Sequence, residues 1–145
     1  MSRTFADSRL VEAIADHIRF HRKVIASGNR YVSAFGTRSE AAGRFGTVGD
    51  STVLVEVQVR FTEKYVYMHV PGAPRHEHRV QVGARAQCQG HGCIDPVHKT
   101  PDSAVFLLGD DADGTAETAL PLVQKAREWA QAHAETCRAK PYTAR

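Results

Sequence analysis

The sequence predicts an α+β fold in which an antiparallel meander of three to four strands packs with an N-terminal and a C-terminal helix. Three patterns predict this fold class. Apolar residues recur at helical spacing over residues 7–27, alternate with polar residues over 51–87, and return to helical spacing over 118–137. The chain has 145 residues, about the length of one domain, so residues 1–145 are expected to form a single domain.

The overall composition is that of an ordinary globular protein, with 42% hydrophobic and 24% charged residues. The formal net charge of +3 is well below the basic density of an obvious DNA-binding arm. The N-terminus lacks the apolar core of a signal peptide, and no apolar run reaches the ~18 residues of a membrane-spanning helix. We therefore expect a cytoplasmic protein with no membrane partner. In a reducing compartment, its three cysteines favour metal or redox roles over disulfides.

The first predicted element is a helix over residues 7–27. Its apolar residues recur every three or four positions, which is the spacing of one helix face. Thr4 and Asp7 have the spacing of a capping box, and Gly28 is a typical residue for the end of a helix.

Residues 30–50 are rich in Gly, Ser, Thr and Arg, and their apolar residues show no long period. We interpret this segment as a long connection with one short helix near residues 39–44. Connections of this length are usually functional or mobile.

Residues 51–87 predict a meander of three strands with short links. Valine alternates with polar residues along the first strand, and residues 62–64 form a turn to the second. Short links favour antiparallel neighbours, with one dry and one wet face. The three strands cover residues 52–61, 65–70 and 76–86.

The C-terminal part begins with an irregular segment over residues 94–102, which contains two prolines. A short apolar run at 104–108 predicts a fourth strand. The last helix is expected over 118–137, where Pro121 is tolerated because it lies in the first turn. The tail, residues 138–145, is expected to fray.

Three cysteines and one histidine have the pattern C-x4-C…H-x3-C, formed by Cys88, Cys93, His133 and Cys137. His133 and Cys137 are four residues apart, so they share one face of the predicted helix. Cys88 and Cys93 follow the third strand in a glycine-containing loop. Thiolate and imidazole ligands suit zinc in a closed tetrahedral site. We therefore interpret residues 88–137 as a zinc-binding segment that staples the terminal helix to the sheet.

Other interpretations of the same residues stay open. His91 or His98 could replace His133 as the fourth ligand, or the three cysteines could be small buried residues beside a core histidine. A labile disulfide between Cys88 and Cys93 is a further alternative. Catalysis by the metal would need an open coordination position and a nearby general base. No HExxH sequence accompanies the cysteines, and we assign no catalytic residue.

The end of the chain follows the form WA-x2-HA-x2-C-R, which begins at Trp129 and includes His133 and Cys137. In this feature, the segment from about residue 84 to 141 resembles short zinc-finger-like proteins of actinobacteria and of their phages and plasmids. Those proteins end in a cysteine pair after a strand and then a helix of this form. The resemblance implies a zinc site and no particular activity. The N-terminal half resembles no family.

The wet face of the predicted meander carries tyrosines between arginines: Tyr65, Tyr67, Arg60, Arg79 and Arg85. Aromatic rings on an exposed sheet can stack on single-stranded bases while arginines hold phosphates. These five residues are our candidates for nucleic-acid binding. The leading interpretation is a small zinc-stabilised binding protein that serves as a nucleic-acid-binding accessory or regulator, with DNA or RNA as partner.

Two alternatives from other functional classes accompany this interpretation. The first is a protein–protein adaptor, potentially homodimeric, that uses the first helix or residues 30–50. The second is a small enzyme. Its active site would have no recognisable motif, since the chain has no GxSxG, P-loop or GxGxxG sequence.

Overall fold

The structure, a computed structural model, describes residues 4–28, 36–66 and 75–141. It confirms the predicted α+β class: an antiparallel sheet with strand order β1-β2-β3-β5 accompanies an N-terminal and a C-terminal helix. The elements in chain order are α1 (Phe5–Ala26), β1 (Gly36–Gly46), β2 (Thr52–Val66), β3 (Arg75–Cys88), β4 (Gly90–His91), β5 (Val97–Lys99), β6 (Phe106–Leu107), α2 (Ala112–Glu117), α3 (Ala119–Thr136) and β7 (Lys140–Pro141).

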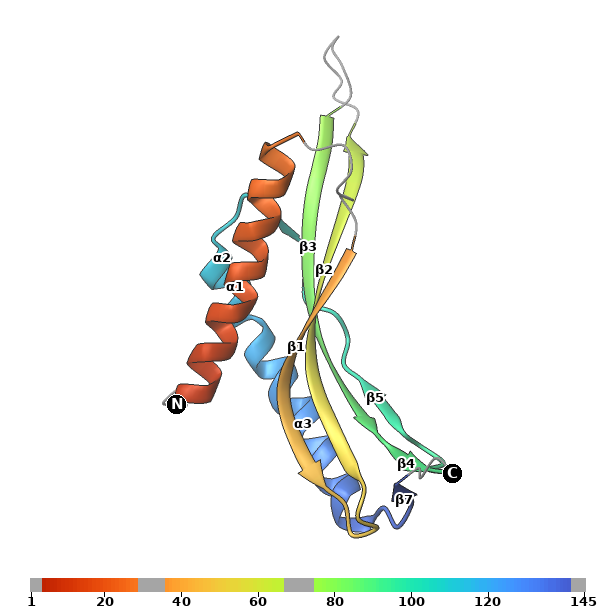
Figure 1. Ribbon diagram of the computed structural model, residues 1–145. Coiled ribbons are helices and arrows are strands. Elements are labelled where there is room, and N and C mark those ends of the chain that lie inside the picture. The colour runs from red at the N-terminus through yellow and green to blue at the C-terminus, as the bar shows by residue number, and fades with distance from the viewer. Residues whose placement is uncertain (1–3, 29–35, 67–74, 142–145) are drawn as a thin grey trace.

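The core lies between the sheet and the helices. Every second residue is buried from Val53 to Phe61 of β2 and, with Gly83 in addition, from Val80 to Cys88 of β3, because this face packs against the helices. Figure 1 shows α1 beside one half of the long, twisted sheet and α3 beside the other half. The fully buried side chains include Ile14 and Ile18 of α1, Val57 and Val59 of β2, and Val123 of α3.

The first helix begins as its sequence predicts. The Thr4 hydroxyl accepts a hydrogen bond from the backbone N–H of Asp7 at 3.0 Å, which satisfies one free donor of the first turn. α3 likewise matches the predicted terminal helix. None of the helices within the described part of the chain is long and apolar enough to span a membrane.

The prediction of a long connection over 30–50 is wrong for most of that range, because residues 36–46 form strand β1, and the short helix expected near 39–44 is absent. β1 lies at the edge of the sheet and leaves most side chains exposed. A β-bulge between Ala41 and Gly43 also interrupts the alternation. The sequence therefore lacks the period-two pattern of a half-buried strand.

The turn predicted at residues 62–64 is also wrong. β2 continues through this segment, and Thr62 and Lys64 pair with Arg79 and Glu77 of β3. Thr62 and Glu63 are half-buried and Lys64 is exposed, so this part of β2 lacks the alternation of buried residues that marks Val53 to Phe61. Polar residues there are compatible with a strand. Of the second strand predicted over 65–70, residues 67–70 lie outside the described residues.

The remaining strands differ in detail from the prediction. The fourth strand is present but short, because only Phe106 and Leu107 pair with β3. The segment expected to be irregular contains β5, whose His98 pairs with Ala86. In the tail expected to fray, Lys140 pairs with His91 of β4, so the chain after α3 returns to the loop that follows β3.

Candidate metal centre

The four residues of the C-x4-C…H-x3-C pattern come together at one end of the sheet. Cys88 is the last residue of β3, Cys93 lies in the loop after β4, His133 is in the last turn of α3, and Cys137 is the C-cap of α3. One ligand atom from each lies within 4.8 Å of the others. This Cys3His group could hold a metal ion.

The separations within the Cys3His group are short and similar. The Sγ atom of Cys137 is 3.8 Å from Sγ of Cys88 and 3.9 Å from Sγ of Cys93. Nε2 of His133 is 3.4 Å from Sγ of Cys93. The four donor atoms therefore lie close enough together to share one metal ion.

The loop after β3 aims its two cysteines by means of backbone turns. The N–H of Gly90 points at Sγ of Cys88 at 3.3 Å, and the N–H of Cys93 donates to the carbonyl of Gly90. Gly92, between them, has φ +79°, in the left-handed region that glycine adopts most easily. This turn directs Cys93 back toward the end of α3.

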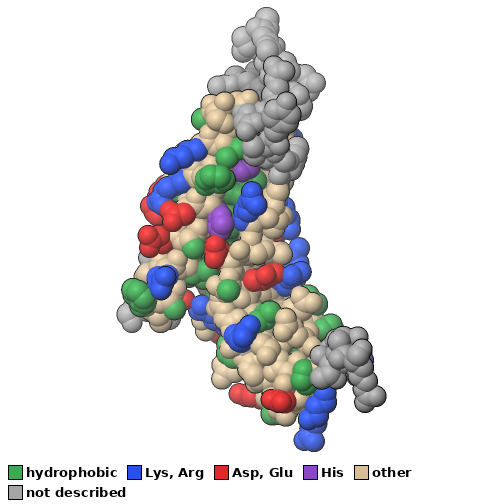
Figure 2. All heavy atoms as spheres, in the orientation of Figure 1, with side chains coloured by type: hydrophobic (Ala, Val, Ile, Leu, Met, Phe, Trp, Pro, Cys, Tyr) green, Lys and Arg blue, Asp and Glu red, His purple; other side chains and the backbone are tan. Residues whose placement is uncertain are grey.

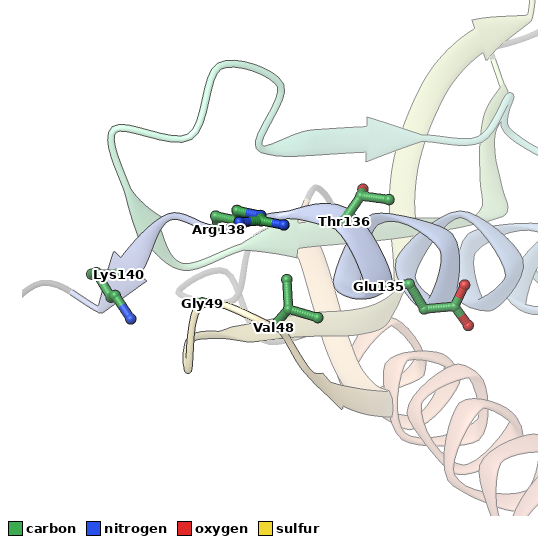
Figure 3. A pocket seen from close by; sticks show the side chains of 6 residues that line it. All are labelled: Val48, Gly49, Glu135, Thr136, Arg138 and Lys140. Carbon is green, nitrogen blue, oxygen red and sulfur yellow. The ribbon is translucent and has the colours of Figure 1, made fainter.

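Hydrogen bonds join the β1–β2 turn to the C-terminal end of α3, which carries two ligands of the site. The N–H of Val48 donates to the carbonyl of Ala134, and that of Gly49 donates to the carbonyl of Cys137 at 3.1 Å. Figure 3 shows this turn facing the end of α3 and the following Arg138 and Lys140, around a cavity of about 670 Å³. The turn thus fixes the backbone that carries one ligand.

An aromatic stack orients the histidine of the Cys3His group. The Trp129 indole stacks on the His133 imidazole with ring centroids 4.6 Å apart, and on His98 with centroids 5.4 Å apart. Neither His98 nor His91 belongs to the group of four ligand atoms that the described residues form. The geometry therefore favours His133 over the two alternatives that the sequence left open.

Burial changes the chemistry of one thiol. The Cys88 side chain is only 4% exposed, and this desolvation raises the pKa of the thiol to about 11. The neighbouring Cys137 and Cys93 raise the pKa further, while the hydrogen bond from Gly90 opposes the shift. At neutral pH the metal-free thiol is protonated, so a metal ion must displace this proton to coordinate the sulfur.

The three arginines predicted to bind nucleic acid lie elsewhere, on the sheet face away from the helices. Arg60 and Arg85 form ion pairs with Asp102 at 2.8 Å and Glu56 at 2.6 Å, respectively. Arg79 pairs similarly with Glu77. Tyr67 and the side chain of Tyr65 lie outside the described residues, so the predicted stacking cannot be placed on this face.

Charges of both signs alternate over the face that Figure 2 shows, along α1 and the neighbouring part of the sheet. Within the described residues, this face of the molecule carries no broad basic area.

Sequence reasoning identified the Cys3His group but missed the residues that support it. The sequence pattern includes Trp129 but assigns it no role. It lies four residues before His133, and this spacing places the two side chains on the same face of a helix. Gly49 lay in a segment interpreted as a connection. Its contact with the end of α3 joins positions far apart in the sequence, and no local pattern predicts it.

Fold and site together define a small α+β protein with a Cys3His group able to hold a metal ion. Comparisons with protein-family models, with curated proteins and with solved structures found no match. The chemistry of the site and of the surfaces around it is therefore the basis for the function proposed next.

Proposed function

We propose that the protein is a small zinc-stabilised binding protein, and the Cys3His group is the observation that carries this proposal. Tetrahedral zinc, with sulfur at about 2.3 Å and nitrogen at about 2.0 Å, places sulfur atoms about 3.8 Å apart and sulfur–nitrogen pairs about 3.5 Å apart. The separations of 3.8, 3.9 and 3.4 Å in the group fit these values. The resemblance of the chain end to short actinobacterial zinc-finger-like proteins supports the same metal.

The proposed role of zinc is structural. Cys88, Cys93, His133 and Cys137 would fill all four positions of a tetrahedral ion, which leaves no open position for a substrate. Zinc would supply bonds that join the end of β3, the following loop and the end of α3. The thiolates of such a site persist in a reducing, cytoplasmic compartment, which we propose as the location of the protein.

Elemental analysis of the purified protein tests the metal directly. We expect one zinc ion per chain after extensive dialysis, and release of that ion by a strong chelator or by a thiol-modifying reagent. A folded protein purified without metal, which takes up no zinc when zinc is added back, would contradict the proposal.

We further propose that the sheet face away from the helices binds single-stranded nucleic acid. Basic side chains reach this face from four neighbouring strands: Arg44 of β1, Arg60 of β2, Arg85 of β3 and Lys99 of β5. Arg44 and Lys99 are exposed. Carboxylates already pair with Arg60 and Arg85, so a phosphate must compete with them. We therefore expect weak binding that depends strongly on salt.

Fluorescence anisotropy with labelled single-stranded DNA and RNA, at low and at physiological salt, tests this partner. The double variant Arg60→Ala/Arg85→Ala should weaken binding at low salt about tenfold or more. The matched control Arg9→Ala/Arg19→Ala removes the same charge from α1 and should bind like the unaltered protein. Equal losses in both variants, or no binding at low salt, would exclude the proposed face.

A further inference from the structure

Within the described residues, β1 is an edge strand whose outer side is open over the first half of its length. Among the described residues, only β2 pairs with β1. Arg127 of α3 donates through Nε to the carbonyl of Ala42 at 2.8 Å, so the bulge is covered. The preceding residues, 36–41, form a regular stretch in which most side chains are exposed. Such an edge is a ready template for pairing with another strand.

A stripe of side chains on α1 lies beside this open edge. Nε2 of His17 is 2.6 Å from Oε1 of Glu40, which joins the middle of α1 to β1. His17 shares its side of the helix with three other residues, because Ala13 lies four residues before it, Phe20 three after it and Val24 seven after it. The Phe20 side chain is 60% exposed, although large apolar side chains are usually buried. Figure 2 shows hydrophobic and histidine side chains along the line where α1 meets the sheet.

We propose that a second copy of this chain docks on this α1–β1 face, defined by residues 36–41 of β1 and by Ala13, His17, Phe20 and Val24 of α1. The two β1 strands pair antiparallel about a two-fold axis at Ser39, which joins the two sheets into one. The contact is isologous, so each copy offers the same surface to the other.

Charge complementarity within β1 supports a second copy as the occupant. With the axis at Ser39, Arg38 of each copy stands opposite Glu40 of the other, so two attractive cross-strand pairs form at once. An axis moved to Ala41 would instead place Arg38 opposite Arg44, which is repulsive. The charges of β1 therefore favour the register centred on Ser39 over the one centred on Ala41.

The position of Phe20 on α1 is also consistent with a two-fold axis at Ser39. α1 and β1 run in opposite directions (Figure 1), and His17 lies level with Glu40 through their hydrogen bond. Phe20 is about 4.5 Å further along α1, and Ser39 is about 3.3 Å in the same direction along β1. Phe20 thus lies nearly level with the axis. In the dimer the two Phe20 side chains approach one another, which removes their apolar surface from water.

Sedimentation velocity over a wide range of protein concentrations tests this dimer. The unaltered protein should shift from monomer to dimer as its concentration rises through the micromolar range. Arg38→Glu places like charges opposite one another and should raise the dimer dissociation constant about tenfold. Arg38→Glu/Glu40→Arg exchanges the two charges and should restore the dimer.

A second pair of variants separates the dimer from general stability. Phe20→Ser should weaken the dimer, whereas Phe5→Ser should not, because Phe5 is exposed at the start of α1, about 22 Å from Phe20 along the helix axis. Circular dichroism should show all variants folded. A protein that stays monomeric throughout the range, or a folded charge-exchange variant that does not dimerise, would overturn the proposal.

Discussion

Cys137→Ser is expected to abolish tight zinc binding and to free the C-terminal end of α3. The Cys137 sulfur lies within 4 Å of the sulfurs of Cys88 and Cys93, so its loss removes one of the four ligands. A bound ligand at about a thousand times its dissociation constant stabilises the folded state by about 4 kcal/mol. For a domain of this size the loss corresponds to a fall in Tm of about 10 °C.

The loss of stability in Cys137→Ser should be large but confined to the region of the site, because the core does not depend on the metal. Buried valines such as Val57, Val59 and Val82 lie four or more residues along the strands from the Val53–Cys88 pair at the site. Hydrogen exchange should therefore accelerate at residues 88–93 and 133–141 while the centre of the sheet keeps its protection. The neighbouring substitution Thr136→Ser should leave both zinc content and exchange unchanged. Global unfolding of Cys137→Ser would show that the metal carries the whole fold.

Histidine variants identify the fourth ligand by the same measurements. His133→Gln should lose zinc, whereas His91→Gln and His98→Gln should keep it, because neither of these side chains lies in the Cys3His group. Retention of zinc by His133→Gln together with loss in His98→Gln would reverse this assignment.

The parts of the fold that the sequence predicts are those with a local physical signature. Thr4 and Asp7 predict the start of α1, because a helix cap is a contact between residues three positions apart in the sequence. The valines of β2 alternate because one face of that strand is buried. The spacing of His133 and Cys137 follows from one helical turn. In each case the constraint acts between residues close in sequence, so it leaves a pattern there.

The parts that the sequence did not predict depend on contacts between distant segments. β1 buries few side chains at the sheet edge, and its bulge shifts the register, so no alternation marks it. The pairing of Lys140 with His91 requires α3 to return the chain to the Cys88–Cys93 loop. Ala139 also lies close to Gly90: a Cβ atom on residue 90 would be 2.6 Å from the Ala139 side chain. Such an approach is a property of the folded backbone.

Gly49→Ala is expected to separate the β1–β2 turn from the segment that follows α3. A Cβ atom at Gly49 would lie 2.4 Å from the carbonyl oxygen of Ala139 and 2.5 Å from the carbonyl carbon of Arg138. These are backbone atoms, which cannot rotate away as the end of a side chain can. Relief requires the two segments to move apart, which breaks the hydrogen bond from Gly49 to the Cys137 carbonyl. Overpacking of this kind costs about 1–3 kcal/mol.

Because Cys137 carries a ligand, this displacement should also weaken zinc binding. Each 1.4 kcal/mol transmitted to the site lowers the affinity about tenfold, which competition with a chromophoric chelator can measure. Gly46→Ala is the matched control, since a Cβ atom on residue 46 meets nothing within 4 Å and the residue ends β1, shortly before the turn that contains Gly49. Loss of both stability and affinity in Gly49→Ala alone would establish that the turn supports the metal centre. Equal changes of stability and zinc affinity in Gly49→Ala and Gly46→Ala would mean that contacts of helices and strands elsewhere, and not the turn, hold Cys137 in place.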